Sequence, residues 1–232
     1  EYKIRNAIAV FLIVFGLFGN MSFITAVRTR SGIRNKHGIL LSIMCVSQTI
    51  CLLFEALKLS NIAIAHSLTR ESCFRVVFLH IIAATYQSIG IFIVGIDILI
   101  SLLAPIKYFN LRNFPYLLYL QVPCVLLSAF FPIYTLSINE PDVPIVDCNP
   151  VLALKFQVFM LWSWCNMVIC VLVVVLYAAM VLIIIVSVIS ARRKDAAMHT
   201  DGVCTKYDAN SQYQRRIVTL MVIFMGVFSF SW

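Results

Sequence analysis

Long apolar runs are the feature that most limits how this chain can fold. A helix that crosses a bilayer core about 30 Å thick needs roughly 20 apolar residues. Five runs meet this length, at about residues 7–27, 39–59, 74–103, 115–136 and 156–189. Because the runs are continuous rather than alternating with polar residues, they indicate helices rather than strands. The sequence therefore predicts an all-α membrane protein.

A sixth apolar run begins at Ile217 and continues to the last residue, Trp232. As a helix these residues extend only about 24 Å. We therefore expect the sequence given to end within its sixth helix. Residues 1–232 are treated as a single transmembrane domain.

The composition narrows the classes of function. Hydrophobic residues make up 62% of the chain and charged residues 12%, against about 25% charged in soluble domains. This excludes a disordered chain, a nucleic-acid partner and an ordinary soluble enzyme. The sequence contains no catalytic motif, no zinc spacing of Cys and His, and no Gly-rich phosphate loop. We therefore expect no enzyme activity, no metal and no cofactor.

The basic residues predict the orientation of the chain. Of the 18 Lys and Arg residues, 12 fall between the first and second, third and fourth, and fifth and sixth runs. The positive-inside rule places these three loops in the cytoplasm and the N-terminus outside, in a multi-pass protein of the plasma membrane. The fourth loop, with Glu140, Asp142 and Asp147, then lies outside. Each basic loop can anchor at the lipid surface, dock a cytosolic partner, or do both.

Two of the eight cysteines, Cys73 and Cys148, fall on the predicted outer face, which is oxidising. We expect them to form a disulfide that closes about 75 residues, with two unpaired thiols as the alternative. Five other cysteines lie within apolar runs and are expected to pack as small apolar residues. Cys204 lies in a predicted cytoplasmic loop and is expected to be reduced.

A spaced set of residues marks the third run and the loop after it. Asp97 follows Cys73 by 24 residues, Pro105 follows Asp97 by eight, and Tyr108 follows Pro105 by three. The first run contains Gly19-Asn20, and the sixth contains Phe228-x-x-Ser231-Trp232.

In this order the residues resemble the rhodopsin-like seven-helix receptors that couple to G proteins. The run D-x-L-x-S-x-x-x-P-x-K-Y, with N-K-H-G-I-L-L after a basic first loop, is most similar to the nematode serpentine chemoreceptors of the Srsx class. The resemblance implies a seven-transmembrane-helix receptor bundle, here truncated within the sixth helix. It implies as partners an extracellular small-molecule or peptide ligand, a heterotrimeric G protein and the lipid bilayer.

The resemblance also suggests site residues. A pocket beneath the Cys73–Cys148 loop would draw on Glu55, His80, Ala84, Tyr86, Gln87, Trp162, Trp164 and Trp232. The residues that change conformation on activation, and those that face the G protein, would be Asp97, Pro105, Tyr108, Tyr177 and Phe228. We call them the switch candidates.

Several pocket candidates have a simpler interpretation. Glu55 and Lys58 share a helix face and can form a pair near the interface. Tyr86 and Gln87, with Thr85, can contact neighbouring helices, and the tryptophans can belong to an interface belt. His80 lies where amine-binding relatives carry an Asp. Because a neutral imidazole does not hold an ammonium ion as a carboxylate does, biogenic amines are disfavoured.

The sequence departs from the wider receptor pattern after Asp97. Ile98 follows it where the pattern has Arg, and Ser47 stands at the position of the second-helix Asp. We expect Asp97 either to be hydrated at its helix end without a partner, or to use Arg112 or Lys107 as its cation. A transporter or channel, or a receptor remnant that does not signal, are the alternative functions.

Overall fold

The computed structural model describes residues 2–59, 68–138, 143–145 and 148–198. Five long helices dominate it: α1 (Tyr2–Thr29), α2 (Lys36–Leu59), α3 (Arg70–Leu103), α5 (Asn113–Ser137) and α7 (Phe156–Met198). Each contains one of the five predicted apolar runs, and each is long and apolar enough to cross a membrane. The predicted sixth helix, from Ile217 to Trp232, lies outside the described residues.

Four short elements connect the long helices. The strands β1 (Leu68–Thr69) and β2 (Pro144–Ile145) pair antiparallel, with Leu68 opposite Ile145. The short helix α4 (Pro105–Asn110) joins α3 to α5, and α6 (Pro150–Ala153) precedes α7. Pro105 occupies the first turn of α4, where its fixed φ suits a helix start and its missing N–H costs nothing.

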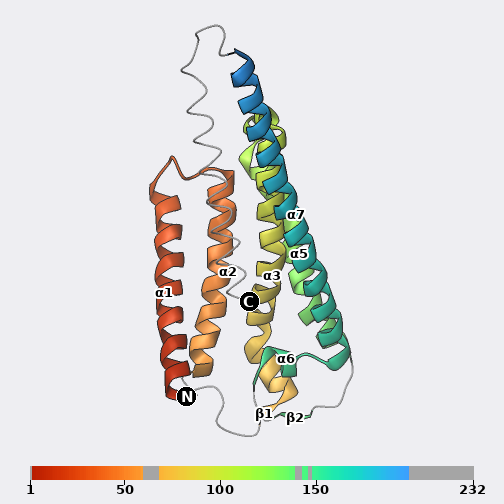
Figure 1. The fold of residues 1–232 in the computed structure, drawn as a ribbon. Helices are drawn as coiled ribbons and strands as arrows, with labels where there is room; N and C mark the ends of the chain where they lie inside the picture. The colour runs from red at the N-terminus through yellow and green to blue at the C-terminus, as the bar shows by residue number, and fades with distance from the viewer. Residues whose placement is uncertain (1, 60–67, 139–142, 146–147, 199–232) are drawn as a thin grey trace. The chain divides into compact units, whose positions relative to one another are not determined.

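By its internal contacts the chain divides into two compact units, residues 1–173 and 174–232, and the boundary falls inside α7. Within the first unit α1 packs on α2, α2 on α3, and α3 on α5 and α6 (Figure 1). α3 has the most contacts with neighbouring elements and the most buried window of the five spans. It therefore forms the centre of this unit and carries residues of both sites described below.

The outer surface of the first unit is apolar. α1 exposes a face of large side chains that includes Phe11, Phe15 and Phe18, the last 72% exposed. Soluble monomers rarely expose continuous apolar patches of this extent. This apolar surface and the five spans are those of a multi-pass membrane protein whose outer surface contacts lipid.

Candidate functional site

A disulfide joins Cys73, in the first turn of α3, to Cys148, just before α6. Both cysteines are buried, and they belong to an apolar core that also contains Phe74, Val77, Phe131 and Val158. The predicted pairing is therefore confirmed. The core ties α3, α5, α6 and the start of α7 together, and we call this part of the first unit the disulfide end.

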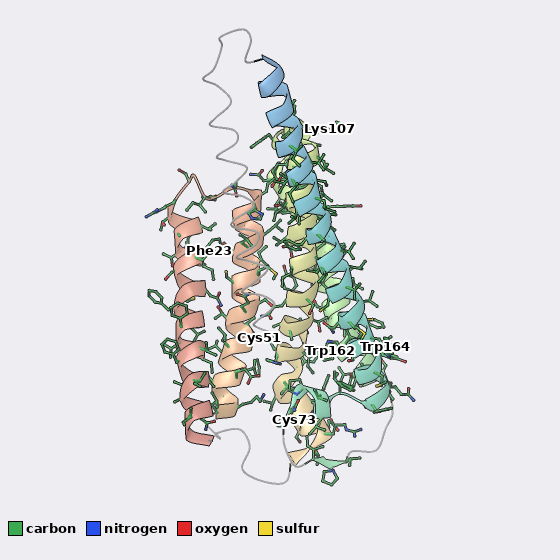
Figure 2. All side chains as sticks on the ribbon, viewed as in Figure 1. Phe23, Cys51, Cys73, Lys107, Trp162 and Trp164 are labelled. Atoms are coloured by element: carbon green, nitrogen blue, oxygen red, sulfur yellow. A yellow bond between two sulfur atoms is a disulfide. The ribbon has the colours of Figure 1, made fainter. Side chains whose placement is uncertain are left out.

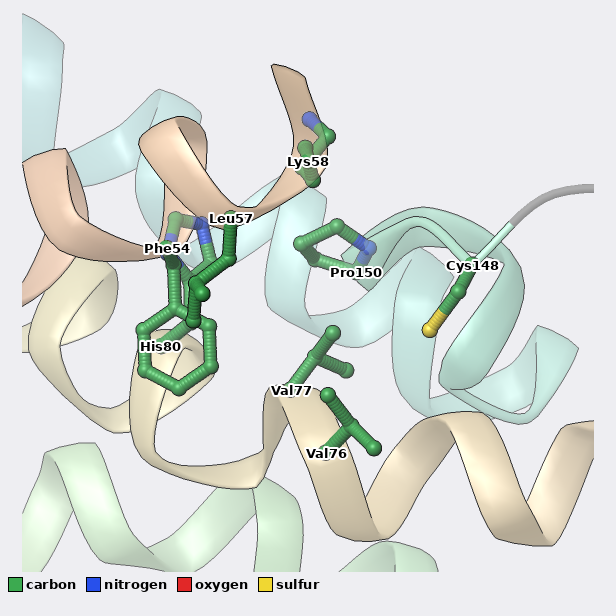
Figure 3. Close-up of a pocket in the computed structure, with 8 residues that line it drawn as sticks. All are labelled: Phe54, Leu57, Lys58, Val76, Val77, His80, Cys148 and Pro150. Carbon is green, nitrogen blue, oxygen red and sulfur yellow. The ribbon is translucent and has the colours of Figure 1, made fainter. Parts of the chain in front are cut away.

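Next to the disulfide is a small cavity of about 20 Å³, which is room for about one water molecule. We call it the α2–α3 hollow (Figure 3). Its lining comes from α2, α3 and the segment around α6: Phe54, Leu57, Lys58, Val76, Val77, His80, Cys148 and Pro150. The wall is mostly apolar, and Lys58 and His80 supply its polar groups.

His80 is the polar residue of α3 in this wall. Its ring meets the Phe54 ring edge to face, with the centroids 5.5 Å apart. Nδ1 of His80 is buried and has no hydrogen-bond partner among the described residues. An unpaired buried nitrogen is costly unless something binds it. His80 thus brings to the hollow a nitrogen without a partner among the described residues, in mostly apolar surroundings.

Lys58 borders the hollow but is already paired. Its Nζ lies 3.1 Å from each carboxylate oxygen of Glu55, one turn earlier on α2. Both side chains are partly exposed. Glu55 is not among the lining residues, so it meets the hollow only through Lys58.

Two other pocket candidates, Tyr86 and Trp162, contact neighbouring helices. Tyr86 donates a hydrogen bond to Gln121 of α5. Trp162 of α7 donates to Thr85 of α3 at 2.8 Å, whereas Trp164, two residues on, is 60% exposed (Figure 2). Ala84 and Gln87 are half-buried and do not line the hollow. Trp232 lies outside the described residues.

Asp97 lies seven turns along α3 from the disulfide, about 36 Å away, and is only 1% exposed. It accepts three hydrogen bonds from three elements. Nδ1 of His37, in α2, lies 3.0 Å from Oδ2. The hydroxyls of Tyr108, in α4, and Tyr116, in α5, donate to Oδ1 at 3.1 and 2.8 Å. Asp97 and these three residues, with Lys36, are called the Asp97 cluster.

Lys36 completes the cluster from the first turn of α2. It is 5% exposed, and its ammonium donates to the backbone carbonyl of Tyr108. The same Nζ lies 4.6 Å from the ring centroid of Tyr108 and 5.5 Å from that of Tyr116. These distances suit a cation over aromatic faces. The ammonium therefore sits on the two rings whose hydroxyls bind Asp97.

The start of α2 is fixed by local structure. The side chain of Asn35 accepts a hydrogen bond from the Gly38 N–H at 2.7 Å, as a helix N-cap does. A Cβ on residue 38 would overlap the carbonyl oxygen of Ile33, so only glycine lets the preceding turn lie this close. The cap and the glycine together orient Lys36 and His37.

Tyr108 remains a hydrogen-bond donor at physiological pH. Burial raises the pKa of its phenol, and the charge of Asp97 and the hydrogen bond to it raise that pKa further. The phenol proton therefore stays on the oxygen and points to the carboxylate.

Two expectations about Asp97 are corrected. It is buried rather than hydrated at the helix end, and its partners are His37, Tyr108 and Tyr116 rather than Arg112 or Lys107. The cause is that α4 folds back on α3 and brings the Tyr108 hydroxyl to the carboxylate. Lys107, on the same short helix, is exposed (Figure 2).

Three switch candidates remain. Pro105 begins α4, and Tyr177 lies in the part of α7 that belongs to the second unit. Phe228 lies outside the described residues.

Sequence reasoning missed His37 and Tyr116 as partners of Asp97, and Lys36 as a partner of Tyr108. It counted Lys36 only as a loop charge that sets orientation. A signal was present: two basic residues follow Asn35 at a helix start, where the helix dipole disfavours positive charge. A residue pattern that opposes its local environment often marks a functional site. Tyr116 gave no such signal.

Comparison with known proteins agrees with this architecture. The profile of the family described as serpentine type 7TM GPCR chemoreceptor Srsx matches residues 13–232. No curated protein sequence matches the chain. The matched segment includes α2 to α7 as well as both the disulfide and Asp97. The chain belongs to the Srsx family of serpentine seven-transmembrane chemoreceptors, a receptor family rather than an enzyme family.

Proposed function

We propose that this chain is a chemosensory receptor that binds a small extracellular ligand at its disulfide end and signals to a heterotrimeric G protein at the Asp97 end. The observation that carries the proposal is the position of two polar residues on one helix. His80 of α3 presents an unpaired nitrogen at the hollow, and Asp97 of the same helix binds α2, α4 and α5.

The distribution of charge supports the orientation. Lys36, Lys107 and Arg112 lie near the Asp97 end, as do Arg28 in the last turn of α1 and Arg30 and Arg34 between α1 and α2. Basic residues beside the spans favour the cytoplasmic side, and a disulfide favours the outer, oxidising side. Both signals support the proposal that the N-terminus lies outside and that the protein belongs to the plasma membrane.

The lining of the hollow favours a small, largely apolar ligand with one hydrogen-bonding group. His80 would supply the polar contact, and Phe54, Leu57 and Val76 the apolar one. Because the hollow has room for about one water molecule, the ligand would have to bind a wider arrangement of α2 and α3. It must bind that arrangement better than this one, since a ligand with equal affinity for both shifts nothing.

The test uses the full chain in cultured cells with an N-terminal epitope tag and sensors of G-protein subunit dissociation. The probes are small alcohols, ketones and carboxylic acids applied outside. We expect the tag to be labelled on intact cells and at least one probe class to give a response. A cytoplasmic tag, or solute flux without any G-protein response, would contradict the proposal and favour a transporter.

Two variants locate the ligand. His80→Leu keeps a side chain of similar reach, but it removes the nitrogen, so we expect the response to be lost at equal surface expression. Glu55→Gln weakens the pair with Lys58 outside the hollow, so we expect the response to be kept. The reverse pattern would move the ligand from the hollow to the Glu55 side of α2.

A further inference from the structure

Asp97 has no basic neighbour on its own helix, where Ile96 and Ile98 flank it. We propose that the first turn of α2 supplies the missing cation: Lys36 and His37 together clamp α4 onto Asp97, and protonation of His37 tightens this clamp. Lys36 and His37 are thus positioning residues that act on the α3–α4 connection. The effect on signalling rests on the proposed function, but the clamp itself does not.

The burial of Asp97 requires such a partner. A carboxylate taken out of water is costly unless charge and hydrogen bonds compensate it. Three donors reach its two oxygens, and two of them are neutral phenols. The third donor is Nδ1 of His37. Among the described residues in direct contact with Asp97, it is the one donor that can carry a positive charge.

The position of Lys36 has no explanation within α2 itself. A positive charge in the first turn of a helix opposes the helix dipole, and a buried ammonium loses its hydration. The contacts with the Tyr108 carbonyl and the Tyr108 and Tyr116 rings compensate both effects. A cation on a ring face also draws electron density from the phenol and makes its O–H a better donor. Lys36 therefore strengthens the two hydroxyl bonds to Asp97 through the rings.

The Asp97 cluster contains one histidine, the residue type that in general changes its charge near neutral pH. The groups that face Asp97 or lie against its partners are Lys36 and His37 from α2, Tyr108 from α4 and Tyr116 from α5. Lysine and tyrosine side chains titrate near pH 10 in general, whereas histidine does so between about pH 5 and 8. The His37 side chain is 36% exposed, so protons reach it, while Asp97 beneath it is buried.

The direction of the effect follows from linkage. In the clamped state His37, when protonated, donates a charge-assisted hydrogen bond to Asp97, and in the open state this bond is broken. A lower pH therefore favours the clamped state, by the reciprocity of coupled binding. Charging the donor also strengthens the bond, since a charge-assisted hydrogen bond is roughly twice as strong as a neutral one.

The clamp controls a surface that is open to a partner. The α4 helix presents Ile106 and Phe109 outward, 77% and 81% exposed, while Tyr108 between them turns inward to Asp97. Releasing Tyr108 would let α4 move and change how these apolar side chains are presented.

The test measures amide hydrogen exchange of residues 104–112 in the full chain, in lipid nanodiscs and without any G protein. Wild type is compared with His37→Arg and His37→Gln at matched pH, which cancels the intrinsic pH dependence of exchange. Between about pH 6 and pH 8, we expect wild-type exchange to rise roughly fivefold relative to His37→Arg, because the charge assistance is lost. His37→Gln should exchange fast at both values.

Controls separate the clamp from general unfolding. His80→Gln removes the other described imidazole, about 25 Å away along α3, and should leave the pH response of α4 unchanged. Protection of residues 73–81 reports whether the bundle stays folded. If His37→Gln unfolds the bundle, the comparison of the wild type with His37→Arg still tests the proposal. A constant ratio between these two across pH would overturn the proposal, whatever the G-protein assays show.

Discussion

The indole Nε1 of Trp162 donates a hydrogen bond to Oγ1 of Thr85, which is 1% exposed, and so links the first part of α7 to the middle of α3. The Thr85 hydroxyl itself donates a hydrogen bond to the backbone carbonyl of Ile81 at 2.8 Å. The Trp162 backbone carbonyl in turn accepts a bond from Asn166. A short polar chain therefore connects the two helices within an apolar interior, where such bonds are well protected from water.

Replacing Trp162 with Phe should weaken this link. The variant keeps an aromatic ring but leaves Thr85 without its donor, so we expect the free energy of unfolding to fall by about 1–2 kcal/mol. Thermal unfolding in detergent measures the change. Trp164→Phe is the matched control, because Trp164 is mostly exposed, and it should shift the Tm little. Equal shifts for both variants would show that the hydrogen bond contributes nothing.

Removing the disulfide should have a larger effect. Cys73 and Cys148 are 75 residues apart, and closing a loop of that length stabilises by about 4–5 kcal/mol on the loop-entropy model. We expect Cys148→Ser to lower the Tm and the amount of receptor at the cell surface. Cys170→Ser, a change at an exposed free cysteine of α7, is the control. A Tm that is equally lowered in both variants would contradict a specific role for the bridge.

The sequence was sufficient to predict elements that depend on local composition. The five spans follow from apolar runs long enough to cross a bilayer, and Cys73 and Cys148 follow from two thiols on one predicted face. The third run was predicted to end at residue 103, which is where α3 ends. These features depend on one segment or on one simple pairing.

The site depended on contacts that no segment encodes alone. The partners of Asp97 come from residues 37, 108 and 116, and their meeting depends on how α2, α4 and α5 pack around α3. Likewise, the rotamer of Tyr86 takes its hydroxyl to Gln121, although its position in the sequence suited a pocket. Helix packing, rather than spacing along the chain, decided these cases.

Gly90 offers a direct test of how α2 and α3 pack. A Cβ on residue 90 would overlap the sulfur of Met44, which is 4% exposed. We expect Gly90→Ala to cost about 1–3 kcal/mol through overpacking. In a Met44→Ala background the same change should cost less, because the sulfur is gone and the new methyl fills part of the cavity. Thermal unfolding of the wild type, the two single variants and the double variant gives the coupling energy between residues 44 and 90.

Gly19→Ala is the matched control for this cycle, because nothing lies within 4 Å of a Cβ at that position. Alanine is the better helix former by about 1 kcal/mol, so its Tm should stay level or rise. Additive effects of Gly90→Ala and Met44→Ala would show that the two residues do not share a contact.

Tyr108→Phe tests the link between α4 and Asp97. The change removes the hydroxyl that lies 3.1 Å from Oδ1 but keeps the ring beneath the Lys36 ammonium. A hydrogen bond to a charged group contributes about 1.5–3 kcal/mol, and we expect the free energy of unfolding to fall by that amount. With Asp97→Asn in the background the loss should be smaller, because the carboxylate charge is absent. An unchanged loss in that background would separate Tyr108 from Asp97.

The same variant has a predicted signature in alkaline solution. Burial, and then Asp97, raise the pKa of Tyr108 above its ordinary value. The folded protein thus holds this proton more tightly than the unfolded chain does. The resulting stability is complete below about pH 10, where tyrosine in the unfolded chain begins to ionise, and is lost as the pH rises further. We expect the Tm of the wild type to fall more steeply above that pH than the Tm of Tyr108→Phe. Parallel curves would mean that the phenol of Tyr108 titrates alike in both states, and that Asp97 does not hold its proton.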